Sequence, residues 1–186
     1  MSDFQEIFSA ALDVIRGCHV ESLLIGGFVV NHYGYSRQTA DIDFMMALSD
    51  VDGMVKAMRN AGFTSYAVYP NVLFFKKPDS AVRIDCLKVG AETLAKLMSA
   101  ATTATILGRD VKIPSLLDLL AMKFHSLSQS TIHREKDMMD IVSLSMIHRL
   151  DPETALRPLA QKFASEEIYQ DVYARIQSIS PLEPNV

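Results

Sequence analysis

The sequence predicts a mixed α/β protein of the α+β class with an all-helical C-terminal part. Segments with the pattern of strands occur, between helical ones, only before residue 113, and every segment after it has the apolar spacing of a helix. We therefore expect an α/β core over residues 1–113 and a helical part over residues 114–186. The helical part should pack on the core to give one compact domain.

The first elements follow from apolar spacing and from glycines. A helix is expected from Phe4 to Gly17, because apolar residues recur on one helical face and a glycine closes it. Residues 22–25 form a short buried strand that Gly26-Gly27 stops. A short helix should then run from Phe28 to Tyr33.

The other core elements alternate between extended and helical patterns. They are a strand over 40–47, a helix from Asp50 or Asp52 to Ala61, extended runs over 72–77 and 82–89, a helix near 92–99, and β-like pieces over 103–107 and 111–113. We expect Gly108-Arg109-Asp110 to be the tip of a hairpin between the last two pieces. Pro114 should lie in the first turn of the next helix. Further helices fit residues 134–149, 152–164 and 166–178.

Composition limits the classes of function. The 186 residues are 49% hydrophobic and 22% charged, as in a globular protein, and need no disulfide or metal to fold. A net charge of −4 argues against sequence-independent DNA binding. Cys18 and Cys86 are too few for a disulfide scaffold or zinc site. With no apolar run near the ~20 residues of a membrane span and no basic N-terminal region, we expect a cytoplasmic protein.

Acidic residues on two strands carry the functional signal. Asp41 and Asp43 alternate with apolar residues, and so does Asp85 on the later run, so each should lie on the polar face of its strand. One interpretation is a solvated open face of a half-covered sheet. Aspartate is disfavoured in strands, however, and a solvent face would more naturally carry threonine, lysine or glutamate.

The alternative interpretation is a metal site. Two carboxylates roughly 4–5 Å apart repel by about 3–4 kcal/mol at an effective dielectric constant of ~20, so they hold a proton or gain a counter-ion. Oxygen ligands at a partly open site suit Mg²⁺ or Mn²⁺. If Asp85 lies on the neighbouring strand, three carboxylates could hold two metal ions, an arrangement that serves phosphoryl or nucleotidyl transfer.

Gly26-Gly27 could hold phosphate. The pair follows a buried strand and opens a short helix, so backbone N–H groups can face an anion, and glycine lets a triphosphate come close. Alone the pair is equally consistent with a simple turn. It matches neither the P-loop pattern nor the dinucleotide-binding pattern.

Three motifs together carry a resemblance to a known family. They are Leu24-Ile25-Gly26-Gly27, Arg37-x-Thr39-x-Asp41-Ile42-Asp43-Phe44 and Arg83-Ile84-Asp85. In this order they resemble the nucleotidyltransferase superfamily of DNA polymerase beta type, most closely small bacterial members that include toxin-like nucleotidyltransferases of abortive-infection systems. The motifs cover about residues 20–90, with a looser resemblance as far as residue 150. The resemblance implies a mixed sheet flanked by helices.

The resemblance also implies roles for single residues. Gly26 and Gly27 would hold the triphosphate, and Asp41, Asp43 and Asp85 would bind two divalent ions. Asp85 would also help to activate the acceptor hydroxyl. The sequence departs from the family at Gly27, where many members have serine, and the resemblance implies that serine would be tolerated there.

Two basic residues are further candidates for binding the nucleotide. Arg37 could contact phosphate, or it could pair with an acidic neighbour as an ordinary loop arginine. Lys123 could reach a phosphate from the first C-terminal helix, or be solvated on its surface. Asp137 and Asp140 share a helix face, and we expect them to pair with a cation such as Lys123, Arg134 or Lys136 rather than to take part in catalysis.

These observations predict a metal-dependent nucleotidyltransferase. It would move a nucleoside monophosphate from a nucleoside triphosphate (NTP) to an acceptor hydroxyl and release pyrophosphate, with Mg²⁺ or Mn²⁺ as cofactor. The acceptor, a small molecule, a protein or an RNA, is left open by the sequence, as is the base of the NTP. The alternative is a catalytically inactive module that binds nucleotide or protein, such as one component of a toxin–antitoxin pair with a partner protein.

Overall fold

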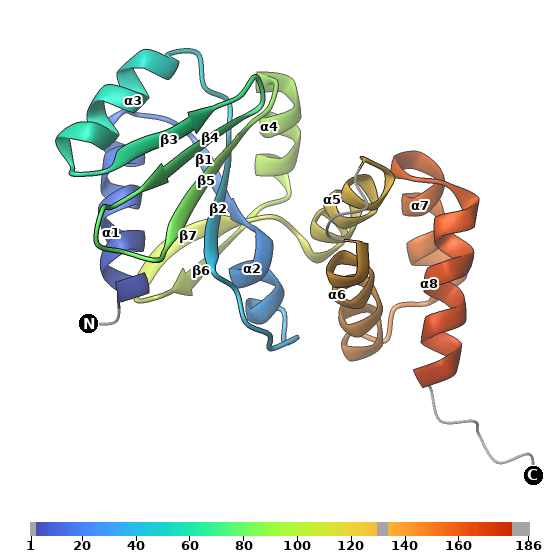
Figure 1. The fold of residues 1–186 in the computed structure, drawn as a ribbon. Coiled ribbons are helices and arrows are strands. Elements are labelled where there is room, and N and C mark those ends of the chain that lie inside the picture. The colour runs from blue at the N-terminus through green and yellow to red at the C-terminus, as the bar shows by residue number, and fades with distance from the viewer. Residues whose placement is uncertain (1–2, 130–133, 180–186) are drawn as a thin grey trace, which may run out of the picture. The chain divides into compact units, whose positions relative to one another are not determined.

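The computed structural model describes residues 3–129 and 134–179, and the chain divides into two compact units (Figure 1). The sheet unit comprises the chain up to His32 together with Ser36–Ser115. The helical unit comprises Tyr33–Tyr35 and the chain from Leu116 onward. A three-residue segment from the first fifth of the chain thus belongs with the C-terminal helices.

The sheet unit alternates helices and strands. Its elements are α1 (Asp3–Gly17), β1 (Ser22–Ile25), α2 (Gly26–His32), β2 (Asp41–Met46), α3 (Val51–Asn60), β3 (Thr64–Val68), β4 (Val72–Lys76), β5 (Arg83–Lys88), α4 (Ala91–Ser99), β6 (Thr102–Ile106) and β7 (Arg109–Ile113). Five strands form one sheet in the order β1-β2-β5-β4-β3, and β6 and β7 form a separate hairpin. Strands β2 and β5 run parallel, whereas the other neighbouring pairs are antiparallel.

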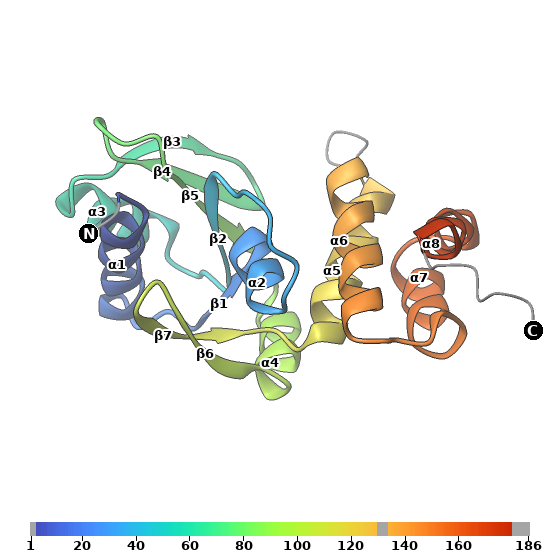
Figure 2. The same cartoon turned by 90° about the horizontal axis from the view of Figure 1, so that it is seen from below.

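The two faces of the five-stranded sheet differ in chemistry. On one face Ile42 and Phe44 of β2 and Ile84 and Cys86 of β5 are buried. Helix α1 covers this face, since the ring of Phe8 stacks on that of Phe44 with centroids 6.0 Å apart. Helix α3 packs beside α1 (Figure 2). The aspartates of β2 and β5 therefore lie on the opposite face.

The expected strand alternation and the mixed sheet are confirmed, but several details of the elements were wrong. Strand β3 was not expected. The hairpin tip is Leu107-Gly108, both with positive φ, instead of residues 108–110, because a two-residue turn of this kind matches the twist of the strands. The first helix of the helical unit begins at Leu116, two residues after Pro114.

Within its described residues, the helical unit contains five helical segments. They are α5 (Leu116–Gln129), α6 (Arg134–Ile147), the π-helical η1 (Pro152–Leu156), α7 (Arg157–Phe163) and α8 (Glu166–Ile179). Helix α5 contacts α6, α7 and α8, so it lies at the centre of this unit. None of the helices within the described residues is long and apolar enough to span a membrane. The α+β fold class is confirmed: the described strands all belong to the sheet unit, together with four helices, and the described part of the helical unit contains only helices.

Candidate active site

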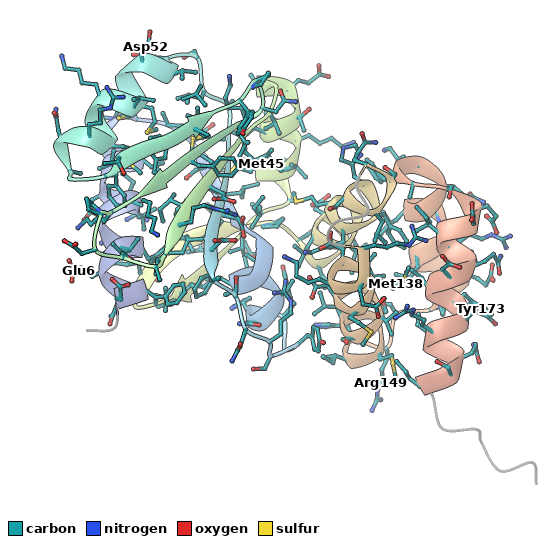
Figure 3. All side chains as sticks on the ribbon, viewed as in Figure 1. Glu6, Met45, Asp52, Met138, Arg149 and Tyr173 are labelled. Atoms are coloured by element: carbon teal, nitrogen blue, oxygen red, sulfur yellow. The ribbon has the colours of Figure 1, made fainter. Side chains whose placement is uncertain are left out.

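Three carboxylates lie on the sheet face opposite to the one that α1 covers. The parallel register of β2 and β5 places Asp43 opposite Asp85 and Asp41 opposite Arg83. Side chains alternate along each strand, so all four point to the same face. Met45, labelled in Figure 3, continues this face of β2 beyond Asp43. The structure thus brings together the three aspartates that the sequence singled out.

The guanidinium of Arg83 lies between two of these carboxylates. Its Nε donates to Asp85 Oδ1 at 2.6 Å, and its Nη2 donates to Asp85 Oδ2 at 2.8 Å. The same Nη2 donates to Asp41 Oδ2 at 2.9 Å. The counter-ion that paired carboxylates require is therefore an arginine in this structure. The hydrogen bond to Asp85 in turn raises the pKa of Arg83.

Asp85 is the more enclosed of the two carboxylates that Arg83 contacts. Its side chain is 15% exposed, against 37% for Asp41. Burial raises the pKa of the Asp85 carboxyl above its ordinary value, because lost hydration outweighs the hydrogen bond and charge of Arg83, and the charge of Asp41 adds to the rise. A carboxylate with a raised pKa is better suited to accept a proton than an ordinary one.

The glycine turn lies directly against the carboxylates. Gly26 follows β1 without a loop, begins α2 and has φ +70°, a conformation that side chains rarely adopt. A Cβ at this position would lie 2.0 Å from Asp43 Oδ2. Helix α2 therefore starts at Gly26, earlier than the expected Phe28, and only glycine fits between this turn and Asp43.

Gly27 faces two side chains of the loop before β2. A Cβ at Gly27 would lie 2.5 Å from Thr39 Oγ1, 2.6 Å from Thr39 Cβ and 3.2 Å from Arg37 Nη1. Arg37 is positioned by Asn31, whose Oδ1 accepts from the Arg37 backbone N–H at 2.9 Å and whose Nδ2 donates to the Arg37 carbonyl at 3.0 Å. The candidate phosphate residues Gly26, Gly27 and Arg37 are thus neighbours.

This geometry corrects the expectation that serine would be tolerated at Gly27. A serine Cβ would overlap Thr39, and the overlap includes the Cβ of Thr39, which cannot swing away without moving the backbone. The threonine hydroxyl fills the space that a serine side chain would take. Thr39 Oγ1 in turn donates to the carbonyl of Asp41 at 3.2 Å, which ties the loop to the start of β2.

Lys123 lies in the helical unit, where it is paired with acid side chains. It is 8% exposed, and its Nζ lies 2.6 Å from Asp137 Oδ1 and 2.8 Å from Asp140 Oδ2. Ser126 Oγ also donates to Asp137, at 2.6 Å. The expected pairing of the two aspartates with Lys123 is confirmed, whereas Arg134 pairs with Asp171. A contact of Lys123 with phosphate stays a prediction.

The donor set of the three aspartates fits a hard divalent cation. Carboxylate oxygens are what Mg²⁺ and Mn²⁺ prefer, and the position of Arg83 shows that the site needs positive charge. As they stand, no three histidine, cysteine, aspartate or glutamate side chains among residues 3–129 and 134–179 are arranged to hold a metal ion. Because Arg83 contacts Asp41 and Asp85, a cation held by these two carboxylates together would displace it.

Sequence reasoning gave no role to Arg83 or to Thr39. Arg83 lies two residues before Asp85 on the same strand, so alternation alone puts both on one face. That spacing was a sufficient signal for an arginine–carboxylate pair. The contact of Thr39 with the space beside Gly27 depends on how the loop folds back, and no local pattern predicts it.

The fold is that of the nucleotidyltransferases. The chain is similar to ANT(2″)-Ia, an antibiotic-resistance factor, with TM-score 0.62, 15% identity and coverage of 94% of this chain and 95% of that one. It is similar to the lincosamide antibiotic adenylyltransferase LnuA, with TM-score 0.55, 16% identity and coverage of 79% and 98%. A nucleotidyltransferase-like protein from Paracoccidioides brasiliensis matches with TM-score 0.55, 17% identity and coverage of 97% and 90%.

No protein-family model matches the chain, and no curated protein sequence matches it either. At 15–17% identity the solved structures establish the arrangement of the backbone. The resemblance first carried by the glycine pair and the aspartates is therefore confirmed for the fold.

Proposed function

We propose that this chain is a nucleotidyltransferase that moves a nucleoside monophosphate from an NTP to an acceptor hydroxyl, with Mg²⁺ or Mn²⁺. The observation that carries the proposal is the convergence of Asp43, Asp85 and Gly26 at adjoining strand positions. Structures of the same fold include one with adenylyl-2″-tobramycin and one with lincomycin bound. An NTP as substrate implies a reaction in the cytoplasm.

The residues divide the reaction between them. Asp41, Asp43 and Asp85 would hold the divalent ions, which would neutralise the phosphates and the charge that develops during transfer. Gly26, Gly27 and Arg37 hold the phosphates next to Asp43. Most of the catalytic effect in this class of reaction comes from such positioning and charge stabilisation.

Asp85 takes the proton of the acceptor hydroxyl. The acceptor oxygen forms a bond to the α-phosphorus, the bond from the α-phosphorus to the oxygen that bridges it to the β-phosphate breaks, and pyrophosphate leaves with the electron pair. Burial raises the pKa of the Asp85 carboxyl, which makes it a better proton acceptor than an ordinary aspartate.

Transfer of label tests this function. We would incubate the protein with Mg²⁺ or Mn²⁺, each α-labelled NTP, and tobramycin, lincomycin, pooled tRNA or bulk protein as acceptors, and measure labelled product and pyrophosphate. Asp43→Asn should abolish transfer. Asp52→Asn is the matched control, because Asp52 is an exposed aspartate of α3 in the same unit (Figure 3) and should leave transfer unchanged.

The same experiment distinguishes the transferase from the alternative, a catalytically inactive binding module. NTP binding by calorimetry without transfer to any acceptor would favour an inactive nucleotide-binding module, such as a toxin–antitoxin component. The pairing of Arg83 with Asp41 and Asp85 is the observation that keeps this alternative in view, because it satisfies the carboxylates without a metal ion. Absence of NTP binding would contradict both functions.

A further inference from the structure

The sheet face that carries the carboxylates continues past them to an aromatic side chain. In the strand order β1-β2-β5-β4, Gly26 follows the first strand, Asp43 lies on the second, Asp85 on the third and Phe74 on the fourth. Phe74 is the register partner of Asp85, so its ring lies on the same face as the carboxylates. The site therefore runs from a glycine turn to a phenylalanine.

Phe74 is half-buried and forms a pair with a second ring. The centroid of Tyr69, in the connection between β3 and β4, lies 5.9 Å from that of Phe74, with the ring planes at 77°. Tyr69 is 57% exposed. The guanidinium carbon of Arg83 lies over the ring of Phe74, 4.9 Å from its centroid. One face of Phe74 thus already receives a flat cationic group that also touches Asp85 and Asp41.

In the proposed reaction, the acceptor would approach the phosphate from the side of this aromatic pair. In nucleotidyl transfer the attacking and leaving oxygens lie roughly in line, on opposite sides of the phosphorus. With the phosphates at Gly26-Gly27, pyrophosphate leaves on the β1 side. The acceptor must then approach from the side of Asp85 that faces β4, where Phe74 and Tyr69 lie.

We propose that Phe74 and Tyr69 form an acceptor platform, on which the ring that carries the acceptor hydroxyl packs while its oxygen reaches Asp85. This inference rests on the proposed function and names its acceptor class: a small hydroxyl compound built on a ring. Aromatic side chains give such a ligand a rigid apolar surface at low cost in conformational entropy.

The surroundings favour a small ring compound over a nucleic acid. The platform is two rings wide and borders on Asp85 and Asp41, and the chain as a whole carries a net charge of −4. An RNA acceptor would bring its phosphate backbone close to these carboxylates, which would repel it. A single ring needs only the two aromatic side chains and the base.

A unique fluorophore can report on the platform. The chain contains no tryptophan, so Phe74→Trp introduces a single indole. We would titrate this variant with tobramycin, lincomycin, uridine and the acyclic polyol sorbitol, each with and without Mg²⁺ and a non-hydrolysable ATP analogue. At least one ring compound should change the emission saturably, and sorbitol should not. Tyr173→Trp is the control, because Tyr173 also belongs to an aromatic pair, with Tyr169 of the helical unit.

Affinities complete the test. For each ring compound that changes the emission, Phe74→Ala should weaken binding about fivefold to tenfold by calorimetry, and Phe74→Tyr should restore it. Binding of the Mg²⁺–ATP analogue should be equal in both variants and the wild type. If Phe74→Ala weakens the analogue instead, the ring holds the nucleotide and the platform is overturned.

The two proposals fail in different ways. If the nucleotide analogue binds and no ring compound changes the emission of Phe74→Trp, the platform is wrong and the proposed function stands. If the wild type binds no nucleotide but a ring compound changes the emission, the platform stands and the transfer reaction is wrong. If neither binds, both proposals are overturned.

Discussion

The guanidinium of Arg83 contacts both Asp41 and Asp85, two of the three carboxylates that we propose hold divalent ions. Binding of a metal ion and the present position of Arg83 are therefore competing events. A metal ion would displace Arg83 only if its binding to the carboxylates is more favourable in free energy than their bidentate charged hydrogen bonds with the guanidinium.

Arg83→Met should make this competition visible. Without the guanidinium the paired carboxylates repel, so the metal-free variant should melt at a lower temperature than the wild type. Its rise in melting temperature on addition of Mn²⁺ should be larger, because a cation that binds only the folded state stabilises it by mass action. Lys56→Met removes an exposed cation of α3 and should leave the rise unchanged. Equal rises in Arg83→Met and the wild type would mean that Arg83 does not compete.

Asp85 predicts a pH dependence of stability in metal-free protein. Its pKa is raised in the folded state, mainly by burial, above the value of 3.8 for an unperturbed aspartate. Ionisation therefore costs folding energy, and the cost appears as pH rises from 3.8 and is complete above the raised pKa. With EDTA present, the stability of Asp85→Asn relative to wild type should increase in urea melts as the pH rises from 3.8, and level off once the pH exceeds the raised pKa of Asp85. A difference that shrinks as pH rises would contradict the assigned direction.

At the scale of elements, the start of α2 depends on the loop before β2. Helix α2 follows β1 without a connecting residue, so its first turn has no freedom to move away from Thr39. Sequence reasoning located the glycines correctly but treated Gly27 as a position where a hydroxyl was merely absent. The structure shows that Thr39 already fills the space.

Gly27→Ala should therefore destabilise the protein by about 1–3 kcal/mol, as overpacking of a tight site does. Thr39→Gly removes the two closest of the three atoms that the new Cβ would meet, so the double variant should recover part of the loss. The double-mutant cycle should give a clear coupling energy in urea melts. Gly17→Ala is the control, since nothing lies within 4 Å of a Cβ at Gly17. Additive losses would place the strain of Gly27→Ala elsewhere.

Much of the sheet could be predicted from local pattern, and the exceptions have physical causes. The alternation at Asp41–Phe44 and Arg83–Cys86 identified two strands and their polar face, because period-two burial is a strong signal. Strand β3 was missed although it is rich in threonine, valine and an aromatic residue. It lies at the edge of the sheet and pairs with β4 through a bulge, so its residues do not alternate regularly.

The candidate site was predictable only in part. The three aspartates and the glycine pair could be named from spacing, because each lies within a regular strand or at its end. Their neighbours Arg83, Thr39 and Phe74 owe their roles to pairing between strands and to loop folding. The position of Phe74 opposite Asp85 depends on the register between β4 and β5, which the sequence of either strand alone does not predict.

At the scale of the whole molecule, the two units hold their charges in different ways. The aspartates of the sheet unit are partly open to solvent beside one arginine. In the helical unit, Asp137 and Asp140 are buried with Lys123 between them. The partly exposed carboxylates of the sheet unit can therefore exchange Arg83 for another cation, whereas the buried pairing of Lys123 with Asp137 and Asp140 is closed to solvent.

Lys123→Met should accordingly destabilise the helical unit by about 3–5 kcal/mol, because it leaves two buried carboxylates without a cation. Lys136→Met, at an exposed position of α6, should change stability by less than about 0.5 kcal/mol. Urea melts of both variants, followed by far-ultraviolet circular dichroism, check this. A stable Lys123→Met protein that has lost affinity for NTP would show that Lys123 binds phosphate instead.

The parallel pairing of β2 with β5 also sets the order in which the chain can become functional. Asp41 and Arg83 are 42 residues apart, and their strands meet only after the chain between them has closed into a long loop. On the ribosome, the glycine turn and two aspartates emerge well before Asp85. A chain still in synthesis therefore carries an incomplete candidate site, and the proposed transfer reaction could not begin until β5 is free to pair with β2.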